Sequence, residues 1–336
     1  MKRLFQSAFA IAALVGSVYA QEPVNPLAKP AEPTPVAEPA PAAPVVTLVE
    51  AGAEPRQTLR ITPAVGQEQA VRMKMQMTMA MKVDETEPPA QTLPPIVMTF
   101  RTKVVSVEAE GDIRYEFAFT ESTVEGGDEQ IAEVIRGAIA PFTKITGLCR
   151  ISSRGVTKEA KLQTPEDLDP GAASLLDGMK QQMGQMGAPF PEEAVGPGAK
   201  WKVVTKVKSQ GMSIDQTATV ELLEVAGGVV KMSMSLDQSA GAQKINAPGA
   251  GEVDVKSFKS TGTGRIEQKL SALAPMTSSM KLTTDMSMGM KQGGQDHAMS
   301  QHIGLEMTFA PAEVKPAEKP MDKPADKPEE KPEPSK

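Results

Sequence analysis

The stretch VRMKMQMTMAMKV, residues 71–83, decides the fold of this chain. Every second residue in it is apolar, and the residues between are polar or small. Strict alternation places the two sets on opposite faces of a β-strand, and at about 3.3 Å per residue the stretch extends over roughly 43 Å. The apolar set, which we expect to face the inside of a sheet, consists of Val71, Met73, Met75, Met77, Met79, Met81 and Val83.

Strand patterns of the same kind recur along the chain and are separated by glycine and proline turns. Many long antiparallel strands close, or nearly close, because open sheet edges favour aggregation. The predicted fold class is therefore mainly β, a large antiparallel barrel or curved half-barrel with one or two short helices. The expected strands are 58–61, 69–83, 96–107, 113–120, 144–152, 156–162, 200–209, 212–225, 229–238, 258–270, 276–290 and 297–309.

Two segments have the apolar spacing of helices. Asp128 is a good N-cap for a helix with an apolar stripe that includes Ile131 and Ile135, and Pro141 would end it. Residues 164–190 form a second helical segment, although three glycines lower its helix propensity. We expect this segment to connect two halves of the domain.

The two halves resemble each other. Residues 146–151 read TGLCRI and residues 261–266 read TGTGRI. Each motif follows a strand pair closed at a glycine turn, and each half opens with a long strand that follows Gly66 or Gly198. We infer a duplication, with a first unit at about 58–163 and a second at about 198–309, inside a β domain that spans residues 46–310.

Both ends of the chain lie outside this predicted domain. Lys2 and Arg3, the apolar run 8–15 and the sequence Val18-Tyr19-Ala20 are typical of a signal peptide over residues 1–20, cleaved after Ala20. The apolar run is too short for a spanning helix. We expect a secreted or periplasmic protein that does not span the membrane after cleavage.

The mature ends are of low complexity. Residues 21–45 contain eight prolines and predict a disordered linker. Residues 311–336 carry a Lys-Pro-acid repeat and predict a solvated, disordered tail. This tail is a spacer, a contact to an envelope or protein partner, or a tolerated disordered terminus without a function of its own. Loss of Lys2 and Arg3 lowers the formal charge from −6 to −8, which argues against nucleic acid as a partner.

A further motif carries a family resemblance. Residues 191–201 read PEEAVGPGAKW, with the spacing Pro-Glu-x-x-Val-x-x-Gly-x-x-Trp. With the strand-rich pattern, this motif resembles a family of uncharacterised bacterial exported proteins that is similar to the half-barrel of periplasmic lipoprotein carriers. The resemblance implies a curved antiparallel sheet with an apolar cavity, and it carries over no catalytic residue.

The residues offer little for catalysis. The two histidines, His297 and His302, lie in the last predicted strand, and the sequence has no Gly-x-Ser-x-Gly, His-Glu-x-x-His, phosphate-loop or Cys-x-x-Cys motif. The single cysteine, Cys149, forms no internal disulfide, and we expect a buried inert thiol. Trp201 is expected to anchor the core. We predict a binding or structural protein rather than an enzyme.

Three functions stay open. The first is an apolar ligand such as lipid, lined by Met73, Met75, Met77, Met79 and Met81, because methionine suits adaptable contacts. The second is copper(I) binding in residues 286–302, because thioether and imidazole select that ion. Its expected ligands near a hairpin turn are Met288, Met290, His297 and Met299, with His302 on the opposite face. The third is a filled barrel that binds a protein and no small ligand.

Overall fold

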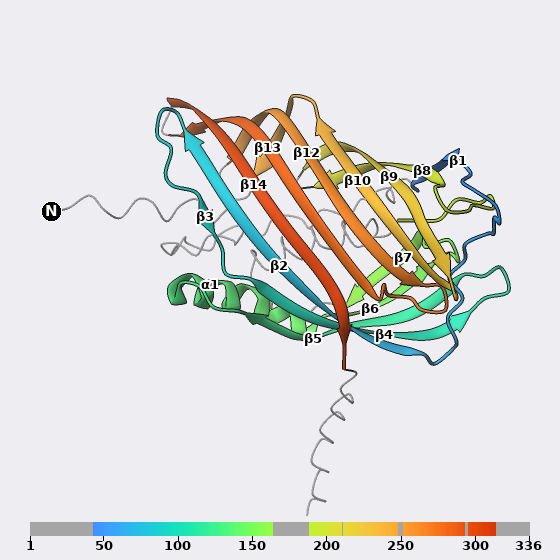
Figure 1. Ribbon diagram of the computed structural model, residues 1–336. Helices are drawn as coiled ribbons and strands as arrows, with labels where there is room; N and C mark the ends of the chain where they lie inside the picture. Colours follow the sequence, from blue (N-terminus) through green and yellow to red (C-terminus); the bar gives the residue numbers. More distant parts are fainter. Residues whose placement is uncertain (1–42, 164–187, 210, 248–250, 293–294, 314–336) are drawn as a thin grey trace, which may run out of the picture.

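The computed structural model describes residues 43–163, 188–209, 211–247, 251–292 and 295–313. Within these residues the strands form one 14-stranded antiparallel sheet that curves strongly (Figure 1). Its order is β1-β8-β9-β10-β12-β13-β14-β2-β4-β5-β6-β7, with β3 added to β2 and β11 added to β12. The strands are β1 (Val45–Glu50), β2 (Glu68–Val83), β3 (Gln91–Thr92), β4 (Ile96–Val107), β5 (Ile113–Val124), β6 (Thr146–Ile151), β7 (Thr157–Gln163), β8 (Lys200–Ser209), β9 (Met212–Ala226), β10 (Val229–Ala240), β11 (Gln243–Ala247), β12 (Gly251–Lys269), β13 (Thr277–Gln292) and β14 (Gln295–Ala312).

The predicted fold class is confirmed, and the sheet takes the half-barrel form. The terminal strands of the order, β1 and β7, do not pair with each other. Some boundaries were wrong. The predicted linker included Val45, which is the first residue of β1. The predicted tail began at residue 311, but β14 continues to Ala312. Residues 1–42 and 314–336, and most of the helical connector, lie outside the described residues.

The segment 58–61 was predicted as a strand, and that prediction is wrong. Its apolar residues Leu59 and Ile61 are buried. The backbone here forms hydrogen bonds with two separate turns and does not pair with a neighbouring strand. The Ile61 amide donates to the Ser153 carbonyl, and the Thr62 amide donates to the Leu270 carbonyl. This loop therefore ties the β6–β7 turn of one half to the end of β12 in the other.

The core on the inner face of the sheet consists of three clusters. The largest surrounds Trp201, where Leu59 and Ile61 meet the ends of strands from both halves. A second cluster lies on β4 and β5, and a third joins β8, β9 and β12 around Val207 and Val255. We call the face that carries these clusters the inner face.

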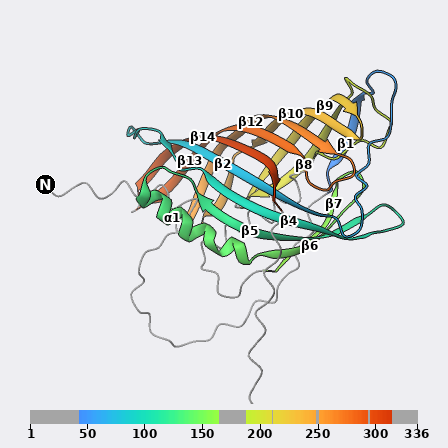
Figure 2. The same ribbon diagram turned by 60° about the horizontal axis from the view of Figure 1, so that its bottom comes forward.

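The helix α1 (Glu129–Ile139) covers β5 on this inner face, as Figure 2 shows from below. Asp128 accepts hydrogen bonds from the amides of Gln130 and Ile131, which confirms the predicted N-cap. Ile135 and Ile139 pack against phenylalanines of β5, and the 3₁₀ helix η2 (Ala140–Lys144) continues the cover. No helix in the described part of the chain is long and apolar enough to cross a membrane.

The two halves repeat one strand order. The series β2-β4-β5-β6-β7 and the series β8-β9-β10-β12-β13 are each consecutive in the sheet. Gly147 in β6 lies opposite Leu162, and Gly262 in β12 lies opposite Leu282. The strand β14 precedes β2 in the sheet as β1 precedes β8. This order is compatible with the predicted duplication, which stays a prediction.

Candidate functional site: the methionine face

The central strands β13, β14 and β2 present a largely apolar surface on the inner side of the sheet, interrupted by Thr284 in β13 and Gln301 in β14. Pairing across these strands places inner residues in rows, such as Met280, Met307 and Met75, or Leu282, Leu305 and Met77. We call this surface the methionine face. Its members are Met280, Leu282, Met286, Met288 and Met290 in β13, Met299, Ile303, Leu305, Met307 and Phe309 in β14, and Met73, Met75, Met77, Met79 and Met81 in β2.

The methionine face is less buried than the cores beside it. Met79 and Met288 are buried, with 6% and 7% exposure, and its other members are half-buried. On one side the second cluster, which includes residues of α1, covers β4 and β5. On the other side the third cluster covers β12. The middle of the inner surface therefore keeps apolar area that the described residues only partly cover.

Charge is confined to the outer side of these three strands. By register, no inner position of β13, β14 or β2 holds Asp, Glu, Lys or Arg. Outer positions alternate with them and hold residues such as Lys74, Lys281 and Glu306, the last two in an ion pair of 2.7 Å. His297 is the one titratable side chain at an inner position of the three strands in the described residues.

The residues expected to bind copper also come together. Met288 pairs directly with Met299 and Met290 pairs directly with His297, so the four lie at the corners of a rectangle near the β13–β14 turn. His302 lies on the outer face and its Nδ1 bonds to Asp285 at 2.7 Å. Both placements agree with the expected parity, while the copper role stays a prediction.

Sequence reasoning missed Asp84, which follows β2. Its Oδ2 lies 2.8 Å from Nδ1 of His297, and its Oδ1 accepts a hydrogen bond from the Ala298 amide. The hydrogen bond from His297 is the main reason that the pKa of Asp84 is lowered. More than two hundred residues separate Asp84 from His297, and no local pattern signals their contact.

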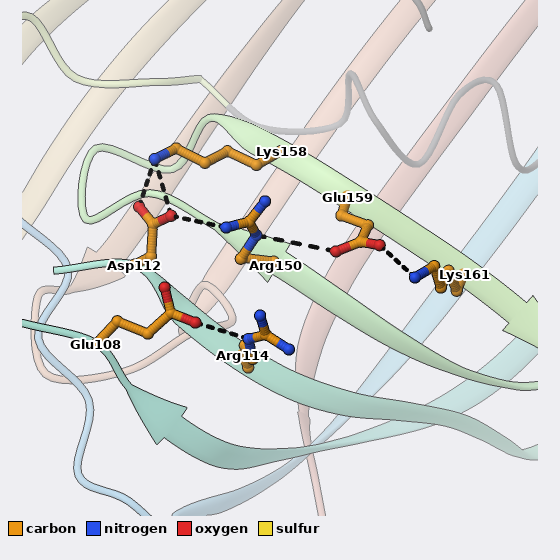
Figure 3. A network of polar contacts seen from close by, with 7 residues as sticks. All are labelled: Glu108, Asp112, Arg114, Arg150, Lys158, Glu159 and Lys161. Atoms are coloured by element: carbon orange, nitrogen blue, oxygen red, sulfur yellow. Dashed lines mark hydrogen bonds and ion pairs between the residues drawn. The ribbon is translucent and has the colours of Figure 1, made fainter. Parts of the chain in front are cut away.

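A second polar cluster joins the β4–β5 turn to β6 and β7 (Figure 3). Asp112 is buried, and both its carboxylate oxygens lie within 2.8 Å of Lys158 Nζ. Arg150 lies 3.6 Å from Asp112 and 3.9 Å from Glu159, and Glu159 pairs with Lys161 at 2.6 Å. These opposite charges neutralise one another across two hairpins, so the cluster fits a structural role.

The buried positions predicted for Trp201 and Cys149 are confirmed. Trp201 is fully buried, and its Nε1 donates a hydrogen bond to the Pro189 carbonyl at 3.0 Å. Cys149 is buried opposite Tyr115, and burial raises the pKa of its thiol. In the described part of the chain, His, Cys, Asp and Glu form no group of three or more that could hold a metal ion.

Comparisons with known proteins assign no function to this chain. No protein-family model matches the chain. A search of curated proteins also finds no match.

Proposed function

We propose that this protein binds an elongated apolar ligand, such as a lipid acyl chain, along the methionine face. The observation that supports this function is an uncharged, half-buried strip of apolar side chains between two packed core clusters. The core around Trp201 has a fully buried centre, which includes Leu59 and Val220, with partly buried residues around it. The methionine face differs from that core in its remaining exposure.

The dimensions suit a chain-like ligand. The inner residues from Met73 to Met81 extend over about 27 Å at the rise of a strand. This exceeds the thickness of one leaflet of a bilayer's hydrocarbon core, roughly 15 Å. Covering about 200 Å² of apolar surface would contribute about 5 kcal/mol before the entropic cost of binding. Methionine side chains adapt to ligands of different shape.

The sequence-based expectations are compatible with this function. A chain exported through the predicted signal peptide would meet membrane lipids outside the cytoplasm. The resemblance to periplasmic lipoprotein carriers implies an apolar cavity inside a half-barrel. The acidic mature chain would gain no electrostatic attraction to anionic lipid surfaces, so the ligand would be held through its apolar part.

The test compares two pairs of residues that are neighbours in register. Met77 and Leu305 pair on the inner face, and Gln76 and Glu306 pair one position away on the outer face. The variant Met77→Gln with Leu305→Gln should weaken binding of a fluorescent fatty acid by at least about 10-fold, which is about 1.4 kcal/mol. The control Gln76→Asn with Glu306→Gln should bind like the unchanged protein.

Native mass spectrometry of the mature protein supplies a second readout. A lipid-sized adduct that is lost in the inner variant and kept in the control would support the proposal. If the unchanged protein carried no adduct and bound no fatty acid, or if both variants lost binding equally, the proposal would be wrong. A filled barrel that binds a protein partner would then be the better reading.

A further inference from the structure

The turn end of the β13–β14 hairpin gathers three thioethers and one imidazole on the inner face. Met288 lies opposite Met299, and Met290 lies opposite His297. Directly opposite Cβ atoms in a sheet are about 5 Å apart, and alternate residues along a strand are about 7 Å apart. Methionine has three rotatable side-chain bonds, so the three sulfur atoms can turn toward the imidazole of His297.

His297 is oriented by a carboxylate. Asp84 Oδ2 lies 2.8 Å from Nδ1, and Asp84 is itself fixed because its backbone and side chain both bond to Ala298. An ionised carboxylate can only accept hydrogen bonds, so Nδ1 of His297 is the donor in this contact, and in the neutral ring Nε2 is then the nitrogen with the free lone pair. No described residue hydrogen-bonds to Nε2. A carboxylate behind a histidine in this way is the usual support of a metal ligand.

The chemistry of the donors selects the ion. Thioether sulfur and imidazole are soft or intermediate ligands that favour copper(I), whereas calcium and magnesium require oxygen ligands. The four side chains carry no charge when His297 is neutral, and Asp84 provides one negative charge behind the histidine. A monovalent ion is therefore compensated there, while a divalent ion would keep an unpaired charge beside apolar side chains.

We propose that Met288, Met290, Met299 and Nε2 of His297 bind one copper(I) ion, with Asp84 as the positioning residue. Packing alone would explain methionines on this face, as it does in other rows. It does not explain a histidine held by a fixed carboxylate among them. The row Met75, Met280 and Met307 has three neighbouring methionines and no imidazole, so it serves as an internal comparison.

The experiment is an anaerobic copper(I) titration of the mature protein against the chromogenic chelator bicinchoninate. Native mass spectrometry with silver(I), a copper(I) analogue that does not change oxidation state, counts the bound ions. We expect one ion per chain. Met288→Leu with Met299→Leu should lower the affinity at least 100-fold, and Met75→Leu with Met307→Leu should change it less than twofold. Leucine keeps the volume of methionine, so both variants should fold.

Asp84→Asn tests the positioning role. It should lower the affinity 10- to 100-fold, the range typical of a residue that orients a metal-bound histidine. In the unchanged protein, silver(I) should shift the nitrogen resonance of Nε2 and leave Nδ1 protonated. The proposal is overturned if no ion binds, if the Met75/Met307 variant loses as much affinity as the Met288/Met299 variant, or if His297→Ala binds normally. None of these results depends on an apolar ligand.

Discussion

Gly262 offers a sharp test of how tightly the sheet is packed. It lies on the inner face of β12 opposite Leu282. A Cβ placed on it would lie 2.8 Å from Leu282 Cδ2 and 2.8 Å from the backbone carbonyl oxygen of Lys281. A side-chain rotation can relieve the first contact and cannot relieve the second, because the carbonyl belongs to the paired strand. In Gly262→Ala the two strands must therefore shift apart.

The expected cost follows from two opposing effects. Overpacking of this kind typically costs 1–3 kcal/mol. Replacing glycine with alanine also reduces the entropy of the unfolded chain, which returns about 0.4–1 kcal/mol. We expect Gly262→Ala to lower the free energy of unfolding by about 1–2 kcal/mol. Gly147→Ala should cost a similar amount, because its Cβ would lie 2.6 Å from Leu162 Cδ2 and 2.9 Å from the Lys161 carbonyl oxygen.

Gly304→Ala is the matched control on the outer face of β14. The nearest atom to a Cβ there is Thr78 Cβ at 3.9 Å, an ordinary contact. This variant should be as stable as the unchanged protein or slightly more stable. Urea unfolding followed by the fluorescence of Trp201, the single tryptophan of the chain, would measure all three variants. Equal stability of Gly262→Ala and Gly304→Ala would refute the packing argument. If only one of Gly147→Ala and Gly262→Ala lowered the stability, the two glycines would not be packed in the same way.

Three further predictions concern single groups. Asp128→Ala should lower the free energy of unfolding by about 1 kcal/mol through loss of the N-cap of α1, while Asp128→Ser should retain most of it; equal urea midpoints would contradict this. Asp112→Asn should cost about 1–3 kcal/mol, because Lys158 and Arg150 lose their shared carboxylate, and the exposed Glu110→Gln should cost nothing measurable. Folding raises the pKa of the Cys149 thiol, so its contribution to stability is present below the unfolded pKa of about 8.5 and is lost as the pH rises further. Cys149→Ala should flatten the fall of stability above about pH 8.5, and iodoacetamide should modify the thiol only in denaturant.

The alternation of apolar and polar residues predicted most of the long strands, because in a strand with one buried face every second side chain points into the core. The expected strands 96–107 and 200–209 match β4 and β8 residue for residue. The same reasoning missed β1, β3 and β11, which are short and lie at the margins of the sheet. It also gave a false strand at 58–61, where Leu59 and Ile61 alternate as they would in a strand. There the backbone forms hydrogen bonds with two turns from different halves of the chain. These partners depend on tertiary contacts, which the local sequence pattern does not contain.

For the candidate site, the sequence could predict which residues share a face and could not predict what covers that face. Partial exposure of the methionine face depends on where α1 and the third core cluster end, and those limits arise only when the sheet curves. The contact of Asp84 with His297 likewise depends on the pairing of β2 with β14.

The same pairing places the centres of the two proposed sites apart. The row through Leu282 and Leu305 and the row through Met288 and Met299 lie six residues apart on β13, which is about 20 Å along the strand. A chain that extends as far as Met81 would end beside the metal site, because Met81 pairs with Gln301, two residues from Met299. Variants at Met77 and Leu305 therefore test the apolar ligand at a distance from the metal, whereas variants at Met288 and Met299 can affect both ligands and need both binding measurements.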